Sequence, residues 1–324
     1  MLLLCMHTKV GIVKCLDYNT SNVTAAIKEI LSYFGGAQNF VKKDSRILIK
    51  PNLLIAATPE KLVTTHPAVI EGIIVNLIES GINHENIHLG DSPGFGTVNG
   101  VAEACGIKKV CDKYRVKIVE FNRPKWVKVD ISGYRKISIA EAAYSYNCII
   151  NAAKLKAHGQ LLLTGAVKNM FGFCIGKIKT YMHLKSRNNT GNFSKMIVKN
   201  YSLINPAFSI VDAIFAMEGI GPTGGNPRNL GLIIAGRDAV AIDRVIAEIL
   251  SIPQDNVPIL KAAKELNIGE SNLENIDVVG TKLDEIRITD FKLNFKLDEI
   301  GFDLFRFVKS HLKDLIAKIK ELHR

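Results

Sequence analysis

The sequence lacks any closely spaced pair of cysteines. Its six cysteines are scattered over the chain, and no two of them form a Cys-x-x-Cys pair. This excludes zinc ribbons, thioredoxin-like dithiols and ferredoxin-like iron–sulfur modules within this chain. Scattered cysteines are typical of buried thiols in a reducing cytosol, so we expect a cytoplasmic protein. The positions are Cys5, Cys15, Cys105, Cys111, Cys148 and Cys174.

The chain also lacks long apolar runs and has few aromatic residues. No apolar run approaches the ~20 residues that a membrane-spanning helix needs, although 47% of the residues are hydrophobic and suffice for a large core. The net charge of +11 permits nucleic acid or an anionic membrane surface as a partner. Because aromatic residues make up only 7% and none alternate with basic residues in an RNA-binding pattern, the sequence argues against nucleic acid.

Acidic residues are absent between Glu141 and Asp212. Within this gap, the segment Asn151–Arg187 carries nine basic residues and no Asp or Glu. Like charges held close together repel one another, and a bound anion removes that cost. We therefore predict a pocket for an anionic small molecule, such as a phosphate, a carboxylate or a charged cofactor. The nine residues are Lys154, Lys156, His158, Lys168, Lys177, Lys179, His183, Lys185 and Arg187.

A basic face in water is the alternative interpretation of this segment. Two of its stretches, Leu161–Leu163 and Met170–Ile175, are too apolar for a face that is fully solvated. Glycines beside the polar residues would also let backbone N–H groups approach an anion. These features favour a partly buried site.

Strand-like and helix-like stretches alternate along the chain, which predicts an α/β fold with a mostly parallel sheet and crossover helices over residues 1–300. We expect one helix through Val101, Cys105 and Val110. The expected strands include Arg46–Leu54, Asn86–Leu89, Cys148–Ile150 and Phe208–Ala213, and we expect a loop over Glu218–Pro227.

Two of these strands end in polar or glycine-rich sequence. Lys50, Pro51 and Asn52 lie at the carboxyl end of one strand, and Gly90–Thr97 (GDSPGFGT) follows the next. Open α/β sheets bind ligands at such strand ends. The loop is not a dinucleotide fingerprint, because Asn99 occupies the position of the third glycine.

Lys168 is the leading candidate for a catalytic or cofactor-anchoring residue. It lies among small and apolar residues, and partial desolvation lowers the pKa of a lysine and makes it nucleophilic. Simple binding of a phosphate is an equally good interpretation. His158 and His183 are candidate metal ligands or proton-transfer groups, with a structural role as the alternative. The candidate cofactor-binding residues are Lys50, Asn52, Asp91, Ser92, Gly94, Lys154, Lys156, Gly165, Asn169 and Gly224.

The tail over residues 301–324 has the pattern of a basic amphipathic helix. From Phe302 to Arg324, apolar residues recur at helical spacing, and lysines fill much of the opposite face. Such a helix can lie on a membrane surface or dock on a partner, and it can also pack on its own domain.

Six sequence blocks resemble the Domain of Unknown Function 362 (DUF362) family, in the family's order and over residues 50–250. They are KPNLL from Lys50, TTHPAVIEGII from Thr64, GDSPG from Gly90, NAAKLKAHGQLLLTGAVKNMFG from Asn151, IVDAIFAMEGIGPTGG from Ile210 and AGRDAVAIDRV from Ala235. The resemblance implies anaerobic redox metabolism. Many members of the family carry an iron–sulfur module that is absent here, so a redox role implies a separate iron–sulfur or electron-transfer partner.

The chain also resembles, more distantly, the amino-terminal half of nickel-pincer lactate racemases. The resemblance rests on the Gly90 loop and on the order His158, Lys168, His183. In that family a lysine attaches a nicotinic-acid-derived cofactor and a histidine binds nickel, which implies a Lys-anchored cofactor here. Asp91 or Ser92 stands where the family has a histidine, which leaves hydride-transfer racemisation without one of its groups.

Two functions follow from these patterns. The first is a cytosolic enzyme that binds an anionic small molecule or cofactor and performs redox or isomerisation chemistry. The second is a non-catalytic accessory or carrier protein for a cofactor or an iron–sulfur partner, which would use the basic tail for docking.

Overall fold

The computed structural model describes residues 7–297, so the predicted tail helix at 301–324 lies outside the described residues. The chain forms a nine-stranded sheet in the order β11-β1-β10-β9-β7-β2-β3-β4, with β8 paired to β7, and a separate hairpin of β5 and β6. The strands are β1 (Thr8–Lys14), β2 (Ile47–Pro51), β3 (Ile87–Asp91), β4 (Lys117–Glu120), β5 (Pro124–Ile131), β6 (Tyr134–Ala140), β7 (Cys148–His158), β8 (Leu162–Thr164), β9 (Phe208–Glu218), β10 (Asn226–Gly236) and β11 (Ile276–Gly280).

Most strand pairings in the large sheet are parallel. The strands β4, β3, β2, β7 and β9 form one continuous parallel array. Among residues 7–297, the antiparallel pairings of this sheet are those of β10 with β1 and β9 and that of β8 with β7. This confirms the predicted α/β fold with a mostly parallel sheet.

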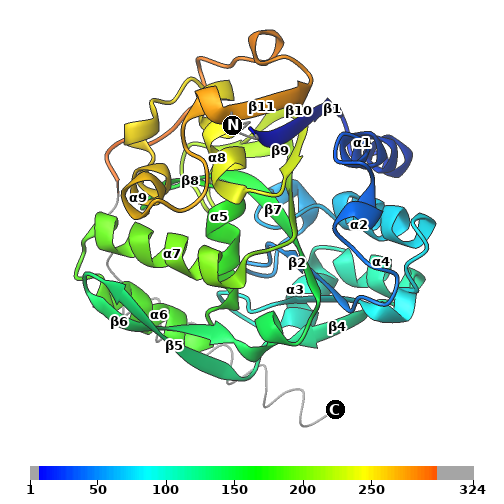
Figure 1. The fold of residues 1–324 in the computed structure, drawn as a ribbon, viewed down its shortest axis with the longest axis horizontal. Coiled ribbons are helices and arrows are strands. Elements are labelled where there is room, and N and C mark those ends of the chain that lie inside the picture. Colours follow the sequence, from blue (N-terminus) through cyan, green and yellow to red (C-terminus); the bar gives the residue numbers. More distant parts are fainter. Residues whose placement is uncertain (1–6, 298–324) are drawn as a thin grey trace, which may run out of the picture.

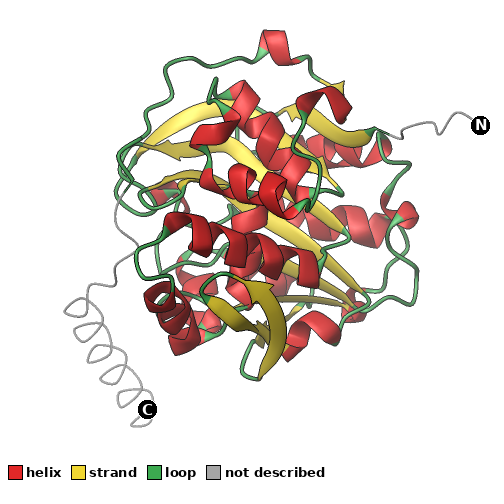
Figure 2. Cartoon of the chain, turned by 60° about the vertical axis from the view of Figure 1, so that its left-hand side comes forward, coloured by secondary structure: helices red, strands yellow, loops and turns green. Residues whose placement is uncertain are grey.

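Helices cover both faces of the sheet, as Figures 1 and 2 show. They are α1 (Thr20–Ser32), α2 (Pro67–Glu79), α3 (Val98–Ala104), α4 (Ile107–Lys113), α5 (Ala166–Asn169), α6 (Gly176–Lys185), α7 (Thr190–Ile204), α8 (Ala239–Ile249) and α9 (Pro258–Leu266). In Figure 1, α1, α2 and α4 lie on one side of the strands and α5, α7, α8 and α9 on the other.

The strand β2 explains why the sheet is buried on both faces. Successive side chains of a strand point to opposite faces. Ile47 and Ile49 accordingly join the apolar cluster under α1 and α2, whereas Leu48 joins the cluster under α7 and α8. A run of apolar residues without polar alternation is the pattern of such a strand.

The structure corrects three predicted boundaries. The helix expected through Val101 and Val110 is two helices, because Gly106 adopts the left-handed conformation (φ 78°) between them. The strand expected at Cys148–Ile150 continues to His158 as β7. The loop expected over Glu218–Pro227 is shorter, since its ends pair with each other as the close of β9 and the start of β10.

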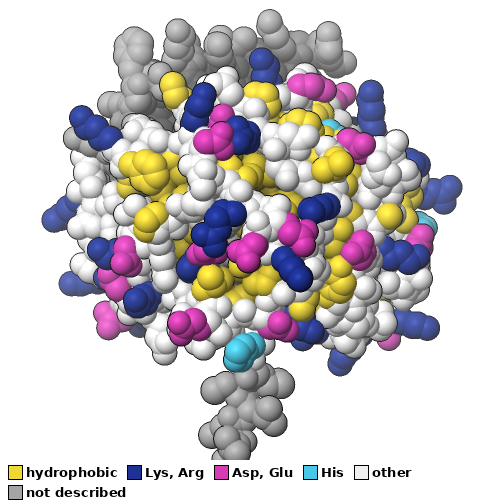
Figure 3. All heavy atoms as spheres, turned by 90° about the horizontal axis from the view of Figure 1, so that it is seen from above, with side chains coloured by type: hydrophobic (Ala, Val, Ile, Leu, Met, Phe, Trp, Pro, Cys, Tyr) yellow, Lys and Arg dark blue, Asp and Glu magenta, His cyan; other side chains and the backbone are white. Residues whose placement is uncertain are grey.

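The extension of β7 changes the setting of the basic segment. Lys154, Lys156 and His158 alternate along one face of this strand, and all three are buried. A solvated basic face therefore does not describe these three residues. On the face that Figure 3 shows, by contrast, positive and negative side chains are interspersed in the manner of an ordinary protein surface.

Lys154 is neutralised by a carboxylate inside the protein. Its Nζ lies 3.0 Å from Asp212 of β9, and neither side chain has any exposed surface. The ammonium also donates to the Tyr18 hydroxyl at 2.8 Å and to the carbonyl of Phe215 at 2.5 Å. Asp212 in turn accepts from the Tyr18 hydroxyl and from the backbone N–H of His66, which caps α2.

We expect Lys154→Met to destabilise the fold by about 3–5 kcal/mol, because it leaves the Asp212 carboxylate buried without its counter-charge. Urea unfolding followed by circular dichroism measures this. Lys28→Met is the matched control, because Lys28 pairs with Glu79 on the surface, where such a pair contributes at most about 1 kcal/mol. Equal losses of unfolding free energy in the two variants would contradict a stabilising ion pair between Lys154 and Asp212.

Candidate active site

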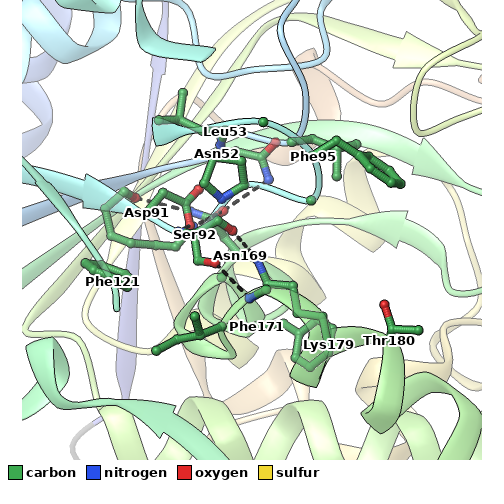
Figure 4. A pocket seen from close by; sticks show the side chains of 18 of the residues that line it. Asn52, Leu53, Asp91, Ser92, Phe95, Phe121, Asn169, Phe171, Lys179 and Thr180 are labelled. Atoms are coloured by element: carbon green, nitrogen blue, oxygen red, sulfur yellow. Dashed lines mark hydrogen bonds and ion pairs between the residues drawn. The ribbon is translucent and has the colours of Figure 1, made fainter. Parts of the chain in front are cut away.

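A cavity of about 390 Å³ lies at the carboxyl ends of β2, β3 and β7. The parallel strands deliver Lys50, Asp91 and His158 to this edge of the sheet, while α5 and α6 close it from one side. This is the position at which open α/β sheets bind ligands. Figure 4 shows Asn52, Asp91, Ser92 and Asn169 gathered there, with Lys179 and Thr180 from α6 beside them.

Nine of the predicted site residues line the cavity. They are Lys50, Asn52, Asp91, Ser92, Gly94, His158, Lys168, Asn169 and His183. The other four predicted residues, Lys154, Lys156, Gly165 and Gly224, are not part of its lining. The structure therefore brings together side chains from positions as far apart in the sequence as Lys50 and His183.

A buried ion pair forms the floor of the cavity. Lys50 Nζ lies 2.9 Å from Asp91 Oδ1, and the two side chains are 1% and 3% exposed. Asp91 also accepts the backbone N–H groups of Leu53 and Ser92, at 2.9 and 2.8 Å. Burial lowers the pKa of Lys50, and the neighbouring carboxylate opposes that shift. The Asp91 carboxylate therefore binds Lys50 and the backbone of the loops that follow β2 and β3.

Amide side chains connect this pair to Lys156 behind the cavity. Lys50 donates to Asn169 Oδ1 at 3.1 Å, and the Asn52 amide donates to the same oxygen at 3.1 Å. Lys156 donates to Asn52 Oδ1 at 2.9 Å and to the Val63 carbonyl at 2.6 Å. Burial lowers the pKa of Lys156 well below its usual value, and nearby lysines lower it further. Asn52 and Asn169 therefore position lysines.

The two predicted glycines outside the lining lie before α5 and in a turn. A Cβ at Gly165 would lie 2.1 Å from the Asp243 carboxylate, which accepts the N–H groups of Ala166 and Val167 at 2.7 and 3.1 Å. Asp243 thereby holds the first turn of α5, and burial raises the pKa of this carboxyl to about 7. Gly224 lies in the turn between β9 and β10. The neighbouring Gly221 packs against the Ala157 carbonyl.

Lys168 of α5 and Lys179 of α6 both face the cavity. Among residues 7–297, Lys168 Nζ makes no hydrogen bond or ion pair, and Lys179 donates only to the Ser92 carbonyl. Burial lowers the pKa of each to about 8. Repulsion from Lys179 and Lys50 adds to the shift of Lys168, whereas attraction to Asp91 opposes the shift of Lys179. The cavity therefore holds two ammonium groups without a carboxylate partner.

The two histidines are neutral at pH 7. His158 Nδ1 accepts the Gln160 N–H at 3.2 Å, so its Nε2 carries the proton. Burial lowers the pKa of His158 well below its usual value and the pKa of His183 to about 3. The described residues contain no group of three or more His, Cys, Asp and Glu side chains that could hold a metal ion.

The sequence did not single out Lys179 as a site residue, and it gave no sign of two buried aromatic side chains that line the cavity. Lys179 belongs to the acid-free segment, but nothing in its spacing distinguishes it from Lys177 or Lys185. Phe121 and Phe171 line the cavity and are almost fully buried. Phe121 comes from the end of a short strand that the sequence did not connect to the basic segment. Only the folded sheet brings these groups together.

Known proteins match the chain in sequence. The model of the family called Domain of unknown function (DUF362) matches residues 47–248. The thylakoid-associated protein sll1697 of Synechocystis sp. is 32% identical over 317 residues, which are 98% of this chain and 97% of that protein. In the described part of the chain, no helix is long and apolar enough to cross a membrane.

One solved structure is also similar to this chain. The lactate racemase apoprotein from Thermoanaerobacterium thermosaccharolyticum is similar with a TM-score of 0.43 and 11% sequence identity. The similarity covers 73% of this chain and 55% of that one.

We expect Gly172→Ala to break the floor of the cavity, because the added Cβ would lie 2.3 Å from both Asp91 Oδ1 and Lys50 Cε. Overpacking of this kind costs about 1–3 kcal/mol, which thermal or urea unfolding measures. Gly191→Ala is the control, since its nearest contact there is Asn189 Oδ1 at 3.3 Å. Unchanged stability in Gly172→Ala would refute the tight packing described.

Proposed function

We propose that this chain, which belongs to the DUF362 family of domains of unknown function, is an enzyme that binds an anionic small molecule or cofactor in the cavity beside Lys168. The observation that carries this proposal is the ammonium of Lys168, which has no partner among residues 7–297 and faces a basic cavity. Lys168 is half-buried, and a charge that is partly removed from water without a partner is destabilising, so an anionic ligand would stabilise it.

The chemistry that we propose is redox or isomerisation chemistry with Lys168 as the anchor or nucleophile. With a pKa of about 8, roughly a tenth of the Lys168 side chains are neutral amines at pH 7. Those amines can attack a carbonyl or acyl carbon, as nucleophilic lysines of other enzymes do. The neutral form is already present, so no separate base has to remove the proton.

His158 and His183 would act as neutral hydrogen-bonding groups in this chemistry. A neutral imidazole can accept a proton at one nitrogen and donate from the other. Because His158 Nδ1 already accepts from Gln160, Nε2–H is the group that His158 can offer to a ligand. A cofactor anchored on Lys168 is compatible with this arrangement, and we assign no metal to it.

A second candidate is an accessory or carrier protein located at a membrane surface. The observation behind it is the printed name of the relative from Synechocystis sp., which describes a thylakoid-associated protein. In this proposal the chain remains cytoplasmic and contacts the membrane peripherally, and an electron-transfer partner would supply any iron–sulfur cluster. Retained ligand binding without turnover would favour this candidate over the enzyme.

We expect Lys168→Met to weaken the binding of a small anion by at least about tenfold, because a charge-assisted hydrogen bond contributes roughly 1.5–3 kcal/mol. Isothermal titration with oxalate measures this at pH 7. Lys185→Met is the control, because Lys185 lies on α6 over the rings of Tyr134 and Tyr181 and does not line the cavity. Equal affinities in all three proteins would overturn the proposal.

Intact-protein mass tests the anchoring role separately. Protein purified anaerobically from its native host would carry an added mass that is absent from Lys168→Met. An unmodified chain with normal oxalate binding would reject covalent anchoring while leaving reversible binding in place.

Anion affinity will fall as the pH rises through about 8. A lysine with a lowered pKa is charged below that pKa and neutral above it, so the attraction is present at pH 7 and is lost above pH 8. Oxalate stays dianionic throughout this range, so its own charge does not contribute. Titrations between pH 6.5 and 9.5 measure the change. A flat profile would contradict control by these lysines.

A further inference from the structure

The cavity contains more positive charge than one anionic group requires. Four lysines and two carboxylates line it, namely Lys50, Lys168, Lys177, Lys179, Asp91 and Glu120. The position of each charge determines how strongly it acts on a ligand in the cavity.

Two of the four lysines, Lys50 and Lys177, add little positive charge to the interior of the cavity. Lys50 is paired with Asp91 at 2.9 Å, so this pair is neutral toward a ligand. Lys177 and Glu120 are exposed to solvent at the rim, where their opposite charges are screened. The uncompensated charges inside the cavity are therefore those of Lys168 and Lys179.

These two ammonium groups come from different elements. Lys168 lies on α5, which follows the strand pair β7–β8, and Lys179 lies in the middle of α6. Neither has a carboxylate within ion-pair distance among residues 7–297. The buried side chains of Phe121 and Phe171 line the same cavity. Such walls exclude water, which strengthens both the repulsion between the lysines and the attraction of each for an anion.

We propose that the ligand of this cavity is a small dianion, a dicarboxylate or a phosphate monoester, and that Lys179 is the residue that selects it over a monoanion. This inference rests on the proposed function, since it names the ligand class of the same site. A dianion neutralises both ammonium groups, whereas a monoanion leaves one of these half-buried groups without a counter-charge. The second ammonium group, that of Lys179, is therefore what favours a dianion over a monoanion.

Lys179 also donates to the Ser92 carbonyl, and the Ser92 hydroxyl accepts the Gly176 N–H at 3.2 Å. A structural role for Lys179, in which it ties α6 to the loop after β3, would affect all ligands alike. The preference between dianion and monoanion is the readout that distinguishes selection from tethering.

The experiment is isothermal titration of the whole chain at pH 7 with oxalate, oxamate and methyl phosphate. Oxamate has nearly the shape of oxalate and carries one negative charge. We expect oxalate or methyl phosphate to bind the natural protein at least tenfold more tightly than oxamate, and the tighter dianion identifies the ligand class. In Lys179→Gln we expect this ratio to fall to about one, with oxamate binding largely retained. Lys179→Arg should restore the preference.

Lys185→Gln is the matched control, because it removes a positive charge from the same helix outside the cavity, and it should keep the natural ratio. Two results would overturn the inference: a natural protein that binds oxalate and oxamate equally, or a Lys179→Gln variant that loses both in proportion. Failure of the natural protein to bind any of the three would instead overturn the proposed function.

Discussion

The buried ion pair between Lys50 and Asp91 is the interaction on which the site depends. It joins the ends of β2 and β3, and Asp91 also fixes the loops that follow both strands. Two charges can be removed from water only when their geometry satisfies both of them. Gly172 allows this geometry, because no side chain beyond hydrogen fits beside the pair.

Along β7, three cationic side chains are satisfied in three different ways. Lys154 meets a carboxylate, Lys156 meets carbonyl oxygens from an amide and from the backbone, and His158 is neutral because burial suppresses its protonation. The same residue spacing thus produces an ion pair, a hydrogen-bonded lysine and a neutral imidazole. Each of the three groups is therefore satisfied within the protein, whether it is charged or neutral.

Much of this fold could be predicted from the sequence, because apolar strands and amphipathic helices carry strong local patterns. The strands expected at Arg46–Leu54 and Asn86–Leu89 appear in the structure with shifted ends, as Ile47–Pro51 and Ile87–Asp91. The roles of individual lysines could not be predicted in the same way. Lys154 and Lys168 both lie in the acid-free segment, and only the partner from β9, Asp212, separates a structural lysine from an open one. Such partners are distant in sequence and leave no local signal.

The helix α5 has only four residues, too few to form a stable helix by themselves. Its first turn is held by the Asp243 carboxylate, which belongs to α8. The position of Lys168 therefore depends on α8, a helix that does not line the cavity. Sequence change within α8 can therefore shift Lys168 without altering any residue that lines the cavity.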